Sequence, residues 1–323
     1  MLLKFLVILL IICEQLNINW GAEKLTQMVY HKDQKNNQGY FLFLDKKEIN
    51  KPLVIDKKEA DFIFPLSPLP IKKKDASSPP DLNCVSASVL DFNTAMLLYE
   101  KNKDQKLPMA SLAKIMTAII ILEDNKLDDL VIIKKESLGL TEEESKLGLI
   151  EGDQIKVRDL LYALLIHSAN DSARVLADYK AGDEKKFIEL MNKKAQNLGL
   201  KNTHFATVSG LDEKDNYSSA YDLSFLFKYA CQNPLFLEII NTKEYSFVSA
   251  RGQNFSFSNT NELLGNDSRI IGGKTGFTEG AGRCLISLAQ DKDHKVITVL
   301  MNCPERFEET KKILDWTYSN YLW

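Results

Sequence analysis

Segments with strand-like patterning lie at both ends of the region after residue 80, and segments with helical periodicity lie between them. Near its start, Val85–Leu90 and Ala95–Tyr99 flank an Asx-rich turn and predict a β-hairpin. Near its end, Cys284–Ala289 and Val296–Met301 are rich in β-branched and other apolar residues. This order predicts an α+β domain whose terminal strands share one antiparallel sheet.

The middle of this region has the apolar spacing of amphipathic or buried helices. Predicted helices cover Ser111–Glu123, Arg158–Tyr179, Glu184–Leu198, Ala220–Ala230 and a closing segment at Arg306–Tyr321. Two further strands are predicted at Glu244–Val248 and Asn254–Ser258. No internal repeat is visible, so a repeat architecture is excluded.

The composition is that of a globular chain without a charge bias. Of its 323 residues 45% are hydrophobic and 26% are charged, and 41 Lys+Arg against 44 Asp+Glu leave a net charge of −3. This balance argues against a nucleic-acid partner. The four histidines are scattered and the five cysteines form no C-x-x-C pair, so we expect no metal site and no cofactor. The cysteines fit either buried apolar positions or at most one disulfide.

The first residues have the layout of a secretory signal. Lys4 precedes an unbroken apolar run from Phe5 to Cys13, which Glu14 ends. The run is shorter than the roughly 20 residues that a membrane-spanning helix needs. We therefore predict a signal peptide over residues 1–22 and an exported protein in the periplasm or the extracytoplasmic cell envelope. A retained anchor or a lipidated Cys13 is the alternative, and membrane-surface association is expected only through this N-terminus.

Residues 23–80 form an extension of unknown role. Gly39–Leu44 and Pro52–Ile55 are predicted as short strands, and the proline- and lysine-rich residues 65–80 as a linker. The catalytic domain is then predicted over residues 81–323.

A serine and a lysine three residues apart form the first candidate motif. Ser111 and Lys114 lie at the predicted start of a helix, so their side chains share one face. A serine hydroxyl becomes a useful nucleophile when a neighbouring base takes its proton, and a desolvated lysine can be that base. The motif alone is weak, because a helix cap followed by a solvated lysine gives the same pattern.

A polar cluster interrupts the apolar helical stretch around residue 168. His167, Ser168, Asn170 and Asp171 follow Leu164–Ile166. Buried polar groups are costly unless they are paired, so Ser168 and Asn170 are predicted to bond the lysine and a substrate. The alternative is an Asx-type helix end with Asp171 as the cap. His167 is interpreted as structural.

A glycine-rich segment supplies the third motif. Ile270–Ile271 lead into Gly272–Gly273, followed by Lys274, Thr275 and Gly276. Apolar residues leading into glycines predict an edge strand along which a ligand backbone lies. Lys274 and Thr275 would hold an anionic terminus, and a simple glycine-rich turn is the alternative.

The motifs S-x-x-K, S-x-N and K-T-G in this order resemble those of penicillin-binding proteins and β-lactamases. Further matches, among them Gly210–Asp212 and Asn259–Asn261, make residues 80–321 similar to low-molecular-mass penicillin-binding proteins that are serine-type D-alanyl-D-alanine carboxypeptidases. The resemblance implies a five-stranded antiparallel sheet flanked by helices, with a helical subdomain. It also implies peptidoglycan stem peptides as substrates and acylation by β-lactam antibiotics.

The resemblance places catalytic roles on Ser111, Lys114, Ser168 and Asn170, and substrate-binding roles on Lys274, Thr275, Gly276, Phe277 and Arg306. Ser111 would form the acyl-enzyme and Lys114 would be its base. The backbone N–H groups of Ser111 and Phe277 would form the oxyanion hole, and Lys274, Thr275 and Arg306 would bind the terminal carboxylate.

The resemblance leaves alternatives open. A D,D-endopeptidase acting on peptidoglycan cross-links has the same three motifs. A β-lactamase is less favoured, because residues 192–211 contain no acidic side chain that could activate a deacylating water. A non-catalytic peptidoglycan-binding protein need not keep both Ser111 and Lys114. Ser209 stands where many relatives have histidine, and the chain ends at Trp323, before the membrane-surface helix of many relatives.

Overall fold

The computed structural model describes residues 27–32, 39–44, 69–138 and 145–323. The chain forms two compact units that divide between Pro68 and Leu69. In the first unit, β1 (Gln27–Lys32) pairs antiparallel with β2 (Gly39–Leu44), which confirms the strand predicted at Gly39–Leu44. The predicted signal peptide and the strand predicted at Pro52–Ile55 lie outside the described residues.

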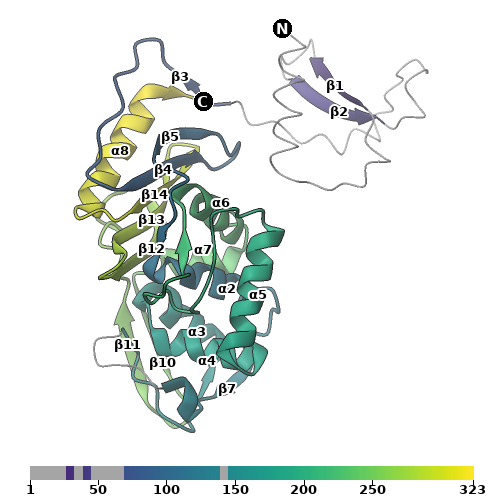
Figure 1. The fold of residues 1–323 in the computed structure, drawn as a ribbon, viewed down its shortest axis with the longest axis vertical. Helices are drawn as coiled ribbons and strands as arrows, with labels where there is room; N and C mark the ends of the chain where they lie inside the picture. The colour runs from purple at the N-terminus through teal and green to yellow at the C-terminus, as the bar shows by residue number, and fades with distance from the viewer. Residues whose placement is uncertain (1–26, 33–38, 45–68, 139–144) are drawn as a thin grey trace. The chain divides into compact units, whose positions relative to one another are not determined.

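A five-stranded antiparallel sheet organises the second unit (Figure 1). Its strands, in sheet order, are β12 (Ile270–Thr278), β13 (Gly282–Asp291), β14 (His294–Met301), β4 (Ser86–Asp91) and β5 (Leu97–Lys101). β14 pairs with β4, so strands from the two ends of the unit lie side by side. This arrangement confirms the predicted α+β class and the shared antiparallel sheet.

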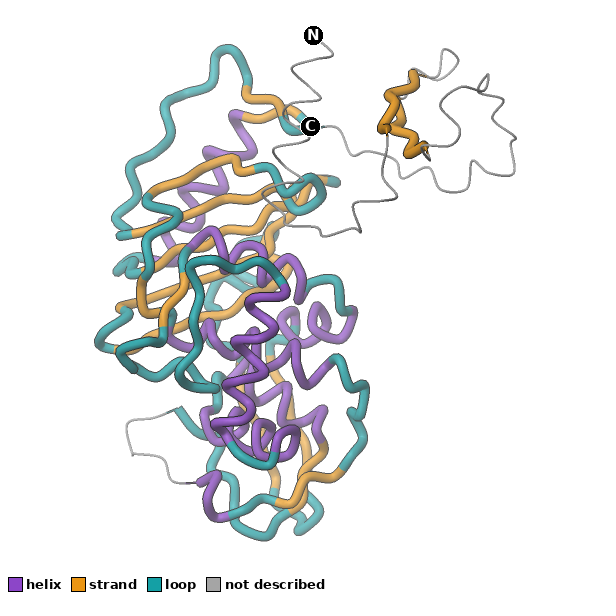
Figure 2. Tube along the Cα trace, turned by 45° about the vertical axis from the view of Figure 1, so that its right-hand side comes forward, coloured by secondary structure: helices purple, strands orange, loops and turns teal. Residues whose placement is uncertain are grey.

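Side chains alternate between the two faces of this sheet, and both faces are covered by helices. On one face, Leu285 and Ala289 pack with α8 (Arg306–Asn320). On the other, Ile286 and Leu288 belong to the large core that α6 (Ala220–Ala230) and α7 (Pro234–Asn241) share. Figure 2 shows the strands stacked together beside the helix-rich part of the unit.

The helix-rich part surrounds α2 (Lys114–Leu122), every residue of which is buried. Its other helices are α3 (Val157–Tyr162), α4 (Asn170–Ala181) and α5 (Glu184–Asn197), with 3₁₀ turns η2 (Ala110–Ala113) and η3 (Lys135–Leu138) and a π-helical turn η4 (Ala163–His167). Two-stranded ribbons join β6 (Leu107–Pro108) to β9 (Tyr217–Ser218), β7 (Leu130–Ile132) to β8 (Gln154–Lys156), and β10 (Glu244–Val248) to β11 (Asn254–Ser258). In the part of the chain that the structure describes, no helix has both the length and the apolar character for a membrane span.

The single helix predicted over Arg158–Tyr179 is wrong in one respect. The chain passes from α3 through η4 to Ser168, whose φ of +66° is left-handed, and only then enters α4. A left-handed residue cannot continue a right-handed helix, so the apolar periodicity hides a break. The break coincides with the polar cluster, and π-helical turns are frequent at functional sites.

Residues 69–85, at the start of this unit, bond to its C-terminal residues. β3 (Ile71–Lys72) pairs with β15 (Tyr321–Leu322), and the Ser77 N–H donates to Asn320 Oδ1 at 2.6 Å. Residues 69–80, which the sequence analysis placed in the linker, therefore lie against the C-terminal residues.

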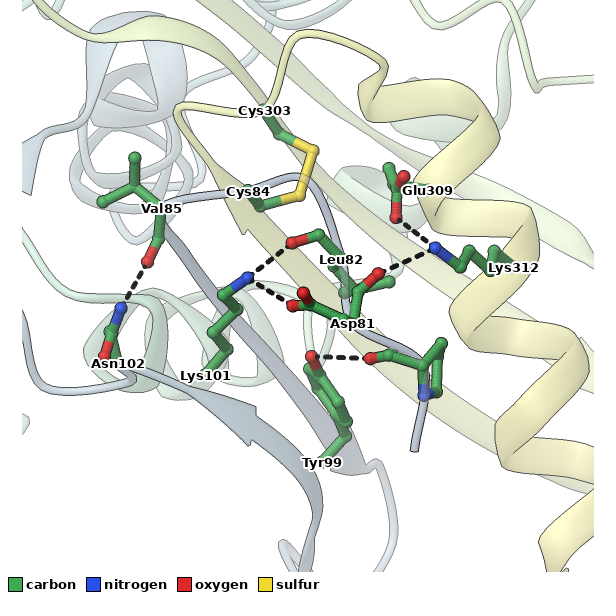
Figure 3. A network of polar contacts seen from close by, with 11 residues as sticks. Asp81, Leu82, Cys84, Val85, Tyr99, Lys101, Asn102, Cys303, Glu309 and Lys312 are labelled. Carbon is green, nitrogen blue, oxygen red and sulfur yellow. Dashed lines mark hydrogen bonds and ion pairs between the residues drawn. A yellow bond between two sulfur atoms is a disulfide. The ribbon is translucent and has the colours of Figure 1, made fainter. Parts of the chain in front are cut away.

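Figure 3 shows the polar network that continues this attachment. Lys101 Nζ contacts Asp81 Oδ1 at 2.8 Å, and Lys312 Nζ from α8 donates to the Asp81 carbonyl at 2.8 Å. Beside it, Cys84 and Cys303 form a disulfide. One disulfide among the described residues agrees with the limit set from the sequence, and the thiols of Cys231 and Cys284 are free and buried.

Candidate active site

Ser111 and Lys114 meet where η2 passes into α2. Lys114 Nζ donates to Ser111 Oγ at 2.7 Å and to the Ser209 carbonyl at 2.8 Å. Lys114 is fully buried. Its amine lies within hydrogen-bond reach of the hydroxyl proton, as a general base must. The structure therefore excludes the alternative of a cap followed by a solvated lysine.

The loop that follows α5 supplies a contact that sequence reasoning missed. Thr117 Oγ1 donates to the Val208 carbonyl at 2.7 Å, and the next carbonyl, that of Ser209, accepts from Lys114. Gly210 has φ +90°, and a Cβ there would lie 1.8 Å from the Ala110 carbonyl oxygen. The loop can approach η2 this closely only with glycine. The Ser209 carbonyl makes this contact, so the bond to Lys114 does not depend on the side chain at this position.

The second motif lies on the turn between η4 and α4. Ser168 and Asn170 are 8% and 4% exposed. The Asn170 N–H donates to the Ser145 carbonyl at 2.8 Å, and the Thr260 N–H donates to the Ile166 carbonyl at 3.0 Å. Both η4 and α4 pack against α2, which begins at Lys114. The structure thus places a buried hydroxyl and a buried amide on elements that border the lysine.

His167 packs its ring against Phe257 at 5.4 Å between centroids, which agrees with a structural role.

β12 is an edge strand, as predicted, and η2 packs against it and against β13. A Cβ at Gly276 would lie 3.2 Å from the backbone nitrogen of Ser111, so the strand and the serine are in close approach. Thr275 Oγ1 and Thr260 Oγ1 are 2.5 Å apart. The Phe277 side chain is 57% exposed. These contacts exclude a simple glycine-rich turn at the third motif.

Two basic side chains bond to backbone carbonyls at the end of β12: Lys274, which belongs to the strand, and Arg306 from α8. Lys274 is 1% exposed, and its Nζ donates to the Thr275 carbonyl at 2.9 Å. Arg306, the first residue of α8, donates from Nη1 to the Gly276 carbonyl at 2.8 Å and to the Cys284 carbonyl at 3.3 Å. Burial, with a further contribution from the charge of Arg306, lowers the pKa of Lys274 to about 7. A bound anion would offset this crowding of positive charge.

Asp212 connects the Ser209 loop with the turn after β12. Its carboxylate accepts from Thr278 Oγ1 at 2.6 Å and from the Gly280 N–H at 2.8 Å. A Cβ at Gly280 would lie 2.9 Å from the Asp212 carboxylate. The loop that contacts Lys114 is therefore also attached to the edge strand.

Direct contacts join four of the predicted residues. Ser111 contacts Lys114, Gly276 borders Ser111, and Arg306 binds the carbonyl of Gly276. A hydroxyl beside a buried amine, next to an open strand edge and two basic groups, is suited to acyl transfer from a ligand with an anionic terminus. Sequence reasoning noted the positions of Ser209, Thr260 and Asp212 but predicted none of their contacts in the site.

Comparisons with known proteins support this interpretation. The family described as D-alanyl-D-alanine carboxypeptidase, Peptidase S11, matches residues 73–305. The D-alanyl-D-alanine carboxypeptidase DacD of Escherichia coli is 35% identical over 257 residues, which cover 75% of this chain and 65% of DacD. The chain therefore spans about two thirds of the length of this relative.

A second relative is covered over most of its length. The D-alanyl-D-alanine carboxypeptidase of Streptomyces sp. strain K15 is 34% identical over 76% of this chain and 90% of its own. The crystal structure of the Streptomyces K15 DD-transpeptidase superposes with a TM-score of 0.72 at 32% identity, and the match covers 75% of this chain and all of that one. This likeness confirms the predicted penicillin-binding-protein fold.

Proposed function

The chain belongs to the Peptidase S11 family of D-alanyl-D-alanine carboxypeptidases, and from that premise we propose that it removes the terminal D-alanine from peptidoglycan stem pentapeptides through an acyl-enzyme on Ser111. The observation that carries the proposal is the 2.7 Å contact between Lys114 Nζ and Ser111 Oγ beside an open strand edge. The buried amine of Lys114 can act as the base that a serine nucleophile needs for its activation.

In the acylation step, Lys114 takes the Ser111 proton while Oγ attacks the carbonyl of the penultimate D-alanine. We assign the developing oxyanion to the backbone N–H groups of Ser111 and Phe277. The C–N bond then breaks, and the proton passes from Lys114 through the Ser168 hydroxyl to the departing amine of D-alanine, while Asn170 positions the peptide. Water next attacks the ester, Lys114 acts as base again, and Ser111 is regenerated.

We assign the terminal carboxylate of the substrate to Lys274 and Thr275, with Arg306 as an additional contact. The lowered pKa of Lys274 supports this assignment, because a bound carboxylate would favour the charged lysine in its buried surroundings. Arg306 also holds the Gly276 carbonyl, so it supports the strand on which the peptide would lie.

A β-lactam would acylate Ser111 by the same nucleophilic attack. Inhibition of the enzyme would follow from which bond breaks, because that bond lies inside the lactam ring. Ring opening leaves the amine tethered to the acyl group, so nothing departs and the ester persists. Intact mass after brief incubation with benzylpenicillin tests this step. We expect one covalent penicillin per chain in the wild type and none in the Ser111→Ala variant.

A second assay separates the peptidase alternatives. The wild type and Ser111→Ala are incubated with a pentapeptide muropeptide and, separately, with a cross-linked dimer. Release of D-alanine from the pentapeptide by the wild type alone supports the carboxypeptidase. Cleavage of the dimer without D-alanine release would establish the D,D-endopeptidase instead. Rapid loss of penicillin without an adduct would establish a β-lactamase.

We further propose that the protein is exported and acts in the cell envelope. The apolar residues 5–13 support export, as does the disulfide between Cys84 and Cys303, because disulfides persist in oxidising compartments. Fractionation of cells that produce the full chain tests this proposal, and recovery in the cytoplasm with reduced cysteines would contradict it.

A further inference from the structure

Asp171 is a buried carboxylate beside the second motif that the proposed mechanism does not use. It is 2% exposed. Its oxygens accept from the backbone N–H groups of Leu147 at 2.9 Å, Gly148 at 2.9 Å, Leu149 at 3.3 Å and Ser172 at 2.8 Å. A carboxylate with several N–H donors makes strong, charge-assisted bonds. A helix cap would bond its own helix, whereas three of these donors belong to a distant segment.

That segment is shaped around the anion. Gly148 has φ +83°, which turns three successive N–H groups toward one point. Concavities of this kind, made by successive backbone N–H groups, bind anions. Leu149 is 7% exposed and belongs to the large core, so the segment is fixed at its far end.

The same segment is also bonded to the turn that carries the second motif. The Ser145 carbonyl accepts from the Asn170 N–H at 2.8 Å, and Ser145 Oγ donates to the His167 carbonyl at 3.2 Å. Residues on both sides of Ser168 are therefore bonded to Ser145. Ser168 itself has φ +66°, a conformation that costs free energy in a residue other than glycine and persists only where the surroundings impose it.

We propose that Asp171 is a positioning residue for acyl transfer: its carboxylate holds residues 145–149 against the Ser168–Asn170 turn and so keeps Ser168 in its left-handed conformation. The inference rests on the proposed function, in which Ser168 relays a proton. The carboxylate of the substrate is assigned to β12, whereas Asp171 bonds to the backbone of residues 147–149 and of Ser172. Loss of Asp171 should therefore slow the chemical step and change substrate binding little.

The test compares Asp171→Asn with Ser172→Ala. The amide keeps the shape of the carboxylate but has one acceptor oxygen in place of two. Ser172 is the matched control, because it is the next residue, is fully buried, and its Oγ has no hydrogen-bond partner among the described residues. We expect kcat for D-alanine release to fall about 10- to 100-fold in Asp171→Asn, with KM within about threefold of the wild type. Ser172→Ala should match the wild type in both.

Penicillin acylation, measured per folded chain at a temperature well below each melting point, separates positioning from stability. A purely structural role would lower the melting temperature and leave this rate constant unchanged, and that result would overturn the inference. If Asp171→Asn does not fold, Gly148→Ala replaces it. A Cβ there meets nothing within 4 Å, so only the positive φ is disfavoured. We then expect a several-fold slower acylation, and an unchanged rate would overturn the inference.

The wild type distinguishes this inference from the proposed function. A wild type that forms no adduct with penicillin would overturn the proposed function and this inference together. A wild-type adduct that forms equally fast in Asp171→Asn and Gly148→Ala would overturn this inference alone.

Discussion

At the scale of single residues, Lys274 and Arg306 would supply the positive charge of the proposed substrate site. Arg306 Nη1 binds the Gly276 carbonyl, and Lys274 Nζ binds that of Thr275, so both cations are held by backbone oxygens of β12. Burial also lowers the pKa of Arg306. Both side chains therefore carry positive charge in buried surroundings, which disfavour the charged form. A carboxylate that arrives there gains from both groups at once.

The pH dependence of kcat/KM follows from the charge of Lys274. Its pKa is lowered to about 7, so in the free enzyme the ammonium form is complete only below that pH and is lost as the pH rises through it. Since the ammonium form is the one that binds a carboxylate, we expect kcat/KM for a D-Ala-D-Ala peptide to fall above about pH 7. The fall in kcat alone should lie at higher pH, because the bound carboxylate stabilises the ammonium.

A pH profile from 5.5 to 9.5 with Arg306→Gln as comparison checks this prediction. Removal of the guanidinium takes away one of the two causes of the lowered pKa of Lys274, so the falling limb should move to higher pH. The value at the optimum should also fall, since Gly276 loses its contact. A kcat/KM that stays level from pH 6 to 9 in the wild type would contradict the assignment of Lys274.

At the scale of elements, the close approach of the Ser209 loop to η2 determines how Lys114 is held. Gly210 is the residue that permits it, because its absent side chain leaves room for the Ala110 carbonyl. In Gly210→Ala the Cβ would lie 1.8 Å from that oxygen, so the loop must withdraw and take the Ser209 carbonyl with it. We expect acylation by penicillin to slow by more than about 100-fold, the range in which a displaced base costs an enzyme.

Gly182→Ala is the matched control for this variant. Gly182 also has a positive φ, of +83°, but a Cβ there meets nothing within 4 Å. The backbone penalty of about 1–2 kcal/mol is thus common to both variants and the collision is not. Both should melt at a lower temperature, and only Gly210→Ala should lose acylation. Equal acylation rates in the two variants would show that the loop does not hold Lys114.

Elements with their own periodicity were predictable, and contacts made by the backbone were not. The helix at Ser111–Glu123 appears as η2 and α2, and the edge strand at Ile270 is β12. The helix predicted over Arg158–Tyr179 ran through the break at Ser168, because helical spacing of apolar residues resumes beyond the polar cluster. The carbonyl of Ser209 and the N–H groups that bind Asp171 carry no signature, since any residue has them. Such partners come from tertiary packing alone.

At the scale of the whole unit, the two ends of the chain between residues 69 and 323 stabilise each other. β4 joins the sheet next to β14, β3 pairs with β15, and the disulfide links residues 219 positions apart. The sequence allowed one disulfide but could not pair the cysteines, because their distance in space depends on how the sheet closes. These links lie next to α8, on the sheet face opposite the one that packs with α6 and α7. These links should therefore affect the stability of the unit more than the rate of acylation.

Removal of the disulfide tests whether these links affect stability without affecting the acylation rate. A link across so long a loop restricts the unfolded chain, so the double variant Cys84→Ala/Cys303→Ala should lose about 2–4 kcal/mol of stability. For a unit of this size that corresponds to a fall in melting temperature of roughly 5–15 °C.

Cys231→Ala, at a free buried thiol, is the control for the loss of a cysteine alone. Because this variant keeps the disulfide, its melting temperature should change with reductant as that of the wild type does. At 20 °C the penicillin acylation rate of the double variant should stay within about threefold of the wild type, because Lys114, Ser209 and β12 keep their contacts. A melting temperature equal to that of the oxidised wild type would show that β3, β15 and the Asp81 contacts suffice to join the two ends. An unchanged melting temperature in reductant for the wild type would give the same conclusion without any substitution.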